Sequence, residues 1–291
     1  MGLDHMNILV IGCDGQLGVC LTKALMLTQW NVRALNKNAL HLGDSARVEF
    51  EVLNYKPNVI INVAAFTTVD EAEDNILAAS SANHYGVINL ATAAEKVGAL
   101  IIHISTDYVF DGVKLDPYIE SDFALPINRY GETKRAGELA LMGLASKYII
   151  IRTSWLFSEY GNNFFTKINN LLKTSSELKV VNDQKGGPTY VGDLVKLIHS
   201  ILLHVNSPNF SSWGIYHYAG YPFVSWYEFA CAINASSASD NNCVILPISS
   251  SSYLSRAKRP LNSCLDSSKA RDIFGVLPSD WQRAIDVING R

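Results

Sequence analysis

The sequence is poor in the features that mark secreted, membrane and nucleic-acid-binding proteins. Its five cysteines are scattered, include no CxxC pair and give no disulfide framework in a chain of 291 residues. A reduced, cytoplasmic location is the simplest interpretation. The longest apolar runs are far shorter than the roughly 20 residues of a membrane-spanning helix, and no secretory signal is recognisable. We therefore expect no membrane partner.

An excess of charge of either sign is also missing. The chain has 24 lysines and arginines and 27 aspartates and glutamates, for a formal net charge of −3. Because no basic run is available to displace counterions from a duplex, no nucleic-acid partner is expected. Hydrophobic residues make up 48% and charged residues 18%, which argues against disorder and a coiled coil. The length suits one large domain or two modest ones.

The first half of the chain alternates between two patterns. Strands that are apolar on both faces, separated by stretches with helical spacing, indicate a parallel sheet covered by helices on each side. The predicted fold class is therefore α/β, a Rossmann-type doubly wound parallel sheet. The predicted strands are 7–11, 31–35, 58–63, 99–105 and 147–154, and the predicted helices are 17–27, 69–97 with a break near Asn75, and 130–144.

The second half mixes shorter elements with serine-rich loops. We assign residues 6–155 mainly to the sheet domain and residues 156–291 mainly to a smaller C-terminal α/β substrate lobe, with crossovers back to the sheet. The first five residues, MGLDH, are interpreted as an added segment, with a native extension left open. The second half is predicted to contain strands 178–181 and 215–218, helices 192–205 and 225–235, and loops 236–242 and 249–252.

Three glycines separate the first predicted strand from the first helix. Gly12 permits a tight turn, Gly15 lets the backbone approach a pyrophosphate, and Gly18 allows close packing of helix on strand. An anion would then rest on the helix N-terminus, where free N–H groups and the helix dipole favour it. Incidental glycines in a strand–turn–helix are the alternative. The position in the first βα unit favours a dinucleotide site.

The end of the second strand bears on the choice of cofactor. An acidic residue there would bond the ribose 2′-OH and select NAD, but the chain has Asn36 and Lys37. These side chains suit a 2′-phosphate, so NADPH is favoured and NADH is left open. A solvated lysine in a loop is the alternative.

Two segments carry residues suited to acid–base chemistry. Tyr130 and Lys134 are four residues apart on a predicted helix and therefore share a face. A lysine ammonium favours the phenolate, so we expect Lys134 to lower the pKa of Tyr130, a proton donor to a carbonyl oxygen. Thr106 follows strand 99–105 at the sheet edge where ligands bind in such folds, and its hydroxyl suits the same oxygen. The alternatives are a half-buried tyrosine, a surface lysine and a threonine that caps a turn.

The sequence resembles the extended short-chain dehydrogenase/reductases, and among them the dTDP-4-dehydrorhamnose reductases, over nearly its whole length. STDYVFDG at 105–112, followed by PYIESDFALPINRYGETKRAGE at 117–138, is the most specific part. Further matching segments are GQLG at 15–18, NVAAFTTVDEAE at 62–73, RTSWLF at 152–157, NDQKGGPT at 182–189, RPLNSCLD at 259–266 and LPSDW at 277–281.

The resemblance implies a role for each matching residue. Thr106, Tyr130 and Lys134 match the catalytic set, and the last two also contact the cofactor. Further cofactor contacts are implied at Gly12, Gly15, Gln16, Leu17 and Gly18 around the pyrophosphate, at Asn36, Lys37 and Asp44 around the adenosine, and at Ala64 and Ala65 beneath the central ribose. Substrate contacts are implied at Thr67, Val69, Thr106, Tyr108 and Trp155 around the sugar, and at His217, Arg259 and Asn262 around the nucleotide.

The chain also departs from the pattern of this family. Cys264 stands where arginine is common, Ser45 replaces an apolar residue near the adenine, and Asn83-His84 replaces the usual Val-Asn pair. The change at Cys264 puts nucleotide or oligomer contacts in doubt. None of these changes touches the Thr, Tyr and Lys set.

The expected reaction is NAD(P)H-dependent reduction of the C4 keto group of a 6-deoxy nucleotide sugar. The favoured substrate is dTDP-4-dehydro-L-rhamnose, which would give dTDP-L-rhamnose. One alternative is a sister reductase acting on another 4-keto nucleotide sugar. The other is a non-catalytic, cofactor-binding regulatory subunit similar to the partner of methionine adenosyltransferase.

The acidic cluster at 70–74 is the candidate metal-binding site in this sequence. It lacks histidine and cysteine companions, so acidic residues in the first turn of a helix are the favoured interpretation, and no metal ligands are assigned. The resemblance leaves Mg²⁺ open without locating a site. It also leaves a homodimer open.

Overall fold

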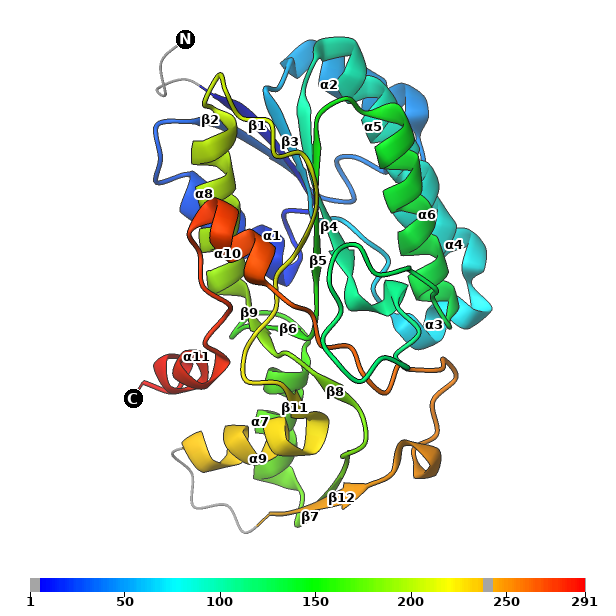
Figure 1. Ribbon diagram of the computed structural model, residues 1–291, viewed down its shortest axis with the longest axis vertical. Coiled ribbons are helices and arrows are strands. Elements are labelled where there is room, and N and C mark those ends of the chain that lie inside the picture. Colours follow the sequence, from blue (N-terminus) through cyan, green and yellow to red (C-terminus); the bar gives the residue numbers. More distant parts are fainter. Residues whose placement is uncertain (1–5, 238–242, 291) are drawn as a thin grey trace.

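The computed structural model describes residues 6–237 and 243–290 (Figure 1). The segment 1–5 and most of the predicted loop 236–242 lie outside these residues. At the centre is a six-stranded parallel sheet, which confirms the predicted fold class. Its strands, in spatial order, are β10 (Gly214–His217), β5 (Tyr148–Thr153), β4 (Leu100–Thr106), β3 (Val59–Asn62), β1 (Asn7–Ile11) and β2 (Asn31–Leu35).

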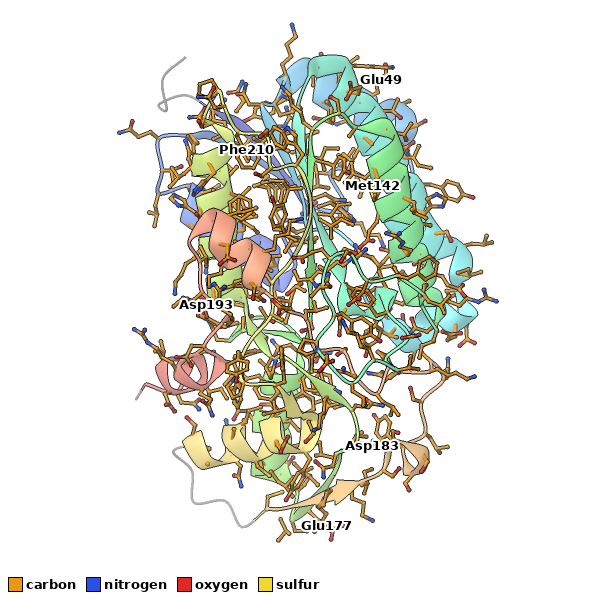
Figure 2. All side chains as sticks on the ribbon, in the orientation of Figure 1. Glu49, Met142, Glu177, Asp183, Asp193 and Phe210 are labelled. Atoms are coloured by element: carbon orange, nitrogen blue, oxygen red, sulfur yellow. The ribbon has the colours of Figure 1, made fainter. Side chains whose placement is uncertain are left out.

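Helices cover both faces of this sheet because each strand sends apolar side chains to both sides. In β1, Ile8 and Val10 enter one core cluster while Leu9 and Ile11 enter the other. Figure 2 shows Phe210 on one side of the sheet and Met142 on the other. One face is covered by α1 (Gln16–Leu25), α8 (Val191–Val205) and α10 (Ser268–Phe274), and the other by α2 (Ser45–Tyr55), α5 (Gly86–Val97) and α6 (Arg129–Leu144) (Figure 1).

The stretch from 69 to 97 is interrupted as predicted. Asn75 has φ −120° and ψ 48°, which ends one helix and begins the next. A π-helical turn then leads into α5. The pieces are α3 (Val69–Asp74), α4 (Ile76–Ser80), η1 (Ser81–Tyr85) and α5. Helix α2 was not predicted; Asp44 caps it by accepting a hydrogen bond from the Arg47 amide at 3.0 Å.

The second half of the chain builds a smaller lobe, shown at the bottom of Figure 1, and also returns to the sheet. Its core joins the aromatic rings of Phe157, Phe165, Phe229 and Trp281. Strand β10 pairs with β5, and helices α8 and α10 pack on the same sheet. The division into two domains at 155, with crossovers, stays a prediction. The remaining elements are η2 (Asp107–Val109), β6 (Leu156–Phe157), α7 (Phe164–Thr174), β7 (Glu177–Val181), β8 (Lys185–Gly186), β9 (Thr189–Tyr190), β11 (Val224–Ser225), α9 (Trp226–Ser236), β12 (Val244–Ile248), η3 (Ser250–Ser252) and α11 (Trp281–Ile288). In the described ranges no helix is both long and apolar enough to cross a membrane.

A buried ion pair fastens α6 to the sheet. The Glu138 carboxylate accepts from Arg152 Nε at 2.9 Å and Nη2 at 2.8 Å, and the Ser105 hydroxyl donates to it at 2.5 Å. Arg135 donates from the side at 2.8 Å. Burial alone would raise the pKa of Glu138, but these hydrogen bonds and the Arg152 charge outweigh it and lower the pKa. The pair therefore links α6 to both β4 and β5.

Replacing Arg152 by methionine should leave Glu138 buried without its partner. We expect Arg152→Met to reduce the free energy of unfolding by about 3–5 kcal/mol, measured by urea denaturation. The matched control is Arg129→Met, because Arg129 pairs with Glu132 on an exposed part of α6 and should cost less than about 1 kcal/mol. Equal effects of the two substitutions would contradict the role given to the buried pair.

Candidate active site

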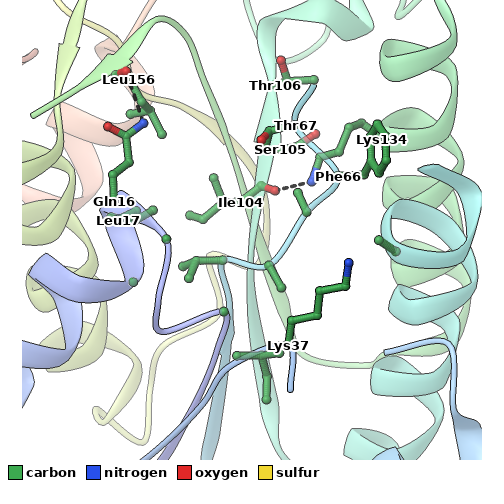
Figure 3. A pocket seen from close by; sticks show the side chains of 18 of the residues that line it. Gln16, Leu17, Lys37, Phe66, Thr67, Ile104, Ser105, Thr106, Lys134 and Leu156 are labelled. Carbon is green, nitrogen blue, oxygen red and sulfur yellow. Dashed lines mark hydrogen bonds between the residues drawn. The ribbon is translucent and has the colours of Figure 1, made fainter. Parts of the chain in front are cut away.

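A cavity of about 810 Å³ opens at the carboxyl ends of the central strands, where parallel α/β sheets bind ligands. Figure 3 shows Gln16 and Leu17 on one side of it and Thr106 and Lys134 on the other. Thirteen of the residues predicted from the sequence line this cavity: Gly12, Gly15, Gln16, Leu17, Gly18, Lys37, Ala64, Ala65, Thr67, Thr106, Tyr130, Lys134 and Trp155.

The glycine loop forms one wall of the cavity. Gly12 has φ +89°, and a Cβ there would lie 2.7 Å from the Ala64 backbone. A Cβ at Gly18 would overlap the Gly12 carbonyl oxygen, so both positions require glycine. Helix α1 begins at Gln16 after Gly15, which has no side chain to cap the first N–H groups. These free donors, beside the cavity, fit the diphosphate of a dinucleotide.

Gln16 also connects this loop to the smaller lobe. Its Nε2 donates to the Leu156 carbonyl at 3.3 Å (Figure 3). Its Oε1 accepts from Asn163 at 3.2 Å and from the Ser158 hydroxyl at 3.3 Å. The cavity is thus bounded by elements of both lobes. The loop cannot move without disturbing β6 and the start of α7.

Thr106 and Tyr130 meet at the other wall. Thr106 ends β4; its hydroxyl donates to Asp107 Oδ1 at 2.9 Å and accepts from the Tyr108 amide at 3.1 Å. Tyr130 lies in the first turn of α6, which Asn128 caps by accepting from the Gly131 amide at 2.8 Å. Burial raises the pKa of Tyr130, and a hydrogen bond with the Thr106 side chain only partly opposes this shift.

Lys134 is buried behind Tyr130. Its Nζ donates to the Ile104 carbonyl at 2.6 Å (Figure 3) and lies 3.3 Å from His103 Nε2. Burial lowers the pKa of Lys134 to about 8. The expectation that Lys134 lowers the pKa of Tyr130 was wrong for this arrangement, because burial of the phenol has the larger effect and the amine hydrogen-bonds to β4.

An aromatic platform faces the cavity from the smaller lobe. Trp155 lines it and stacks on Trp226 of α9, with ring centroids 3.4 Å apart and an interplanar angle of 7°. A Cβ at Gly186 would lie 2.5 Å from the Trp155 ring, so glycine leaves room for the indole. The stack holds Trp155 in place; such a ring suits the apolar face of a sugar.

Three predicted cofactor and sugar residues lie outside the lining of the cavity. The Asn36 side chain accepts from the Ala39 amide at 3.0 Å within its own turn. Asp44 caps α2, and Val69 begins α3. Their ligand contacts stay predictions.

Four predicted substrate residues also lie outside the lining. His217 is fully buried on β10, with Nδ1 3.0 Å from the Tyr118 carbonyl and Nε2 facing Arg152. Asn262 donates to the backbone carbonyls of Lys114 and Asp116. Tyr108 is buried, which raises its pKa to about 12, and hydrogen-bonds with Arg259. The structure therefore gives His217 and Asn262 contacts within the protein, and their contacts with a nucleotide stay predictions.

Sequence reasoning missed Asp107. It lines the cavity next to Thr106, and burial raises its pKa to about 7. Its Oδ2 is buried and has no hydrogen-bond partner among the described residues. The signal was present in STDY, because a carboxylate directly after a strand-end hydroxyl is placed at the same sheet edge.

The acidic cluster at 70–74 secures a loop. Asp70 accepts from Arg259 Nη2 at 3.0 Å, the Ala257 amide at 3.0 Å and the Ser255 hydroxyl at 2.8 Å. Asp74 pairs with Arg256. In the described part of the chain, no three His, Cys, Asp or Glu side chains gather to hold a metal ion. Residues 6–237 and 243–290 therefore give no support for a Mg²⁺ site.

The glycine loop at the sheet edge, with Thr106, Tyr130 and Lys134 around one cavity, defines a Rossmann-type oxidoreductase of the extended short-chain class. The family model described as "RmlD substrate binding domain" matches residues 6–289. A dTDP-4-dehydrorhamnose reductase of Aggregatibacter actinomycetemcomitans is 44% identical over 96% of this chain and 97% of that protein. The chain belongs to the RmlD family.

Solved structures agree with this assignment. A dTDP-4-dehydrorhamnose reductase of Clostridium acetobutylicum superposes with a TM-score of 0.91 at 36% identity, covering 97% of this chain and 98% of that one. The enzyme of Bacillus anthracis, in complex with NADP, gives a TM-score of 0.91 at 34% identity and covers 98% of both chains.

Replacing two helical glycines by alanine should change the stability of the protein in opposite directions. Gly18→Ala should lower the thermal unfolding midpoint by several degrees, because the new methyl group overlaps the Gly12 carbonyl. Gly143→Ala in α6 has no described atom within 4 Å of its Cβ and should raise stability by about 0.5 kcal/mol through helix propensity. Differential scanning fluorimetry compares them; a stable Gly18→Ala would refute the close approach of α1 to the loop.

Proposed function

We propose that this protein reduces the C4 keto group of dTDP-4-dehydro-L-rhamnose to give dTDP-L-rhamnose, using NADPH. The observation that carries the proposal is the meeting of Thr106 and Tyr130 at one cavity wall, with Lys134 behind, opposite an uncapped helix N-terminus. The similar reductases named above support the choice of substrate.

The cofactor would lie across the carboxyl ends of β1 and β3. Gly15, Gln16 and Leu17 would bind its diphosphate through the free N–H groups of α1. Ala64 and Ala65 have small side chains that leave room for the ribose. Lys37 lines the cavity and suits a 2′-phosphate, which supports NADPH over NADH. When bound, the nicotinamide supplies the hydride for C4.

Tyr130 would act as the proton donor. Because burial raises its pKa, the phenol keeps its proton at neutral pH until a carbonyl oxygen gains negative charge beside it. Thr106 would orient that oxygen, since it lines the same cavity wall as Tyr130. Lys134, one helical turn away, would stabilise the phenolate that remains when its own amine carries a proton.

The substrate would enter from the side of the smaller lobe. Trp155 and Thr67 line the cavity and would contact the sugar. Arg259 offers a fork of donors for a diphosphate, but Asp70 holds it in this arrangement, so contact requires exchange of that partner. Contacts from Val69, Tyr108, His217 and Asn262, a cytoplasmic location and a homodimer stay predictions.

A panel of keto-sugar nucleotides tests the proposal. The purified protein should oxidise NADPH fastest with dTDP-4-dehydro-L-rhamnose, followed at 340 nm and by NMR of the product. Faster turnover of another 4-keto sugar would indicate a sister reductase. Cofactor binding without turnover of any member, together with a stoichiometric synthetase partner, would favour the regulatory subunit.

Tyr130→Phe separates chemistry from binding. Loss of the phenolic proton should reduce kcat by about 10²–10⁴-fold and leave the Kd of NADPH near that of the wild type, measured by fluorescence titration. The control is Tyr85→Phe, which removes a hydroxyl from a residue that is 56% exposed. Full activity of Tyr130→Phe would refute Tyr130 as the proton donor.

A further inference from the structure

A chain of three buried polar side chains runs behind the cavity, from β3 through β4 to α6. Asn62 Nδ2 lies 3.0 Å from His103 Nδ1, and His103 Nε2 lies 3.3 Å from Lys134 Nζ. Asn62 and His103 are 1% and 0% exposed, so both lie out of contact with bulk solvent. Neither residue has a role in the function proposed above.

The orientation of the Asn62 amide is fixed by the backbone. Its Oδ1 accepts from the Ala64 amide at 3.2 Å, in the turn that leads from β3 into the cavity wall. Reversing the amide would place its NH₂ group against that N–H and leave a buried donor unpaired. The NH₂ group therefore points to His103, and Nδ1 of His103 must be the acceptor.

This assignment determines where the imidazole carries its proton. Burial lowers the pKa of His103 well below its usual value, so the ring is neutral and has one N–H. Since Nδ1 accepts from Asn62, that proton is on Nε2 and faces Lys134 Nζ. The amine must then accept from His103 while it donates to the Ile104 carbonyl, which only an uncharged amine can do.

We propose that Asn62 and His103 are positioning residues that control the charge of Lys134, and that the arrangement in this structure is that of the neutral amine. Adding a proton to Lys134 requires the His103 proton to move from Nε2 to Nδ1 and the Asn62 amide to reverse. The lysine charge and the histidine tautomer therefore change together. This coupling concerns the cofactor-free protein; only its effect on turnover depends on the proposed function.

The other charged and titratable groups near Lys134 are neutral or already hydrogen-bonded to other partners, so His103 determines the charge of the lysine. On its own helix, Tyr130 is neutral, and Glu138 favours the charged amine but is already bound by Arg152 of β5. Asp107, after β4, directs its Oδ1 to Thr106. The lowered pKa of Lys134 agrees with an amine that gives up its proton readily.

Nitrogen NMR of the cofactor-free wild-type protein tests the proposal directly. Long-range ¹H–¹⁵N spectra of ¹⁵N-histidine-labelled protein distinguish the two tautomers, and lysine Nζ spectra report the charge of Lys134. At about pH 9 we expect His103 in the Nε2–H form, and on lowering the pH both signals should change at one midpoint. The Nδ1–H tautomer at about pH 9, an imidazolium, or separate midpoints would overturn the proposal.

The substitution Asn62→Asp should favour the charged form of Lys134 instead of the neutral amine. A carboxylate still accepts from the Ala64 amide but must also accept from His103, which moves the imidazole proton to Nδ1 and makes Nε2 an acceptor for a charged amine. The lysine midpoint and the basic limb of the kcat/KM profile should then move up by about one pH unit or more. Unchanged values in a folded variant would overturn the proposal.

Asn58→Asp is the matched control. It adds the same charge at the entry to the same strand, and it keeps the acceptor for the Asn7 amide. It should leave the tautomer and both midpoints unchanged; an equal shift would show a general charge effect and overturn the proposal. If Asn62→Asp does not fold, the wild-type spectra decide. Because these spectra need no turnover, inactivity towards every keto sugar would refute the proposed function and leave this result standing.

Discussion

The buried pair of Glu138 and Arg152 is the interaction on which the rest of the site depends. Tyr130 and Lys134 lie on the same helix as Glu138, and Thr106 ends the strand that contributes Ser105 to the pair. If α6 were held only by apolar contacts, it could slide by small amounts along the sheet. The bidentate contact between Glu138 and Arg152 fixes both the rotation of α6 about its axis and its position along the sheet. The alignment of the acid–base residues thus depends on a buried contact on the same helix and strand.

The site combines two kinds of exclusion. The glycine loop excludes side chains, so that backbone N–H groups are exposed to a ligand at close range. At the wall opposite, desolvation displaces the pKa values of a phenol, a carboxyl group and an amine towards their neutral forms. Charge that develops in such a place is met by few, fixed dipoles, which is the condition under which electrostatic stabilisation is strongest.

Much of this could be predicted from the sequence, for identifiable reasons. The β-branched apolar runs predicted the strands, and the glycine spacing and the pair Tyr130 and Lys134 identified both cavity walls. The polar chain from Asn62 to His103 could not be predicted, because it joins residues that are neighbours only through strand pairing. The direction of the Tyr130 pKa shift could not be predicted either, because sequence spacing indicates that a charge is near but not how deeply the phenol is buried.

Strand β10 has a consequence for the synthesis of the protein. It pairs with β5, although sixty residues separate the two strands in the chain. The nascent sheet therefore has an unpaired edge at Ile149–Ile151 while the ribosome is still making the smaller lobe. Phe229 and Trp281 of the smaller lobe's core come after β10 in the chain. Strand β10 is therefore synthesised, and can pair with this edge, before the smaller lobe is complete.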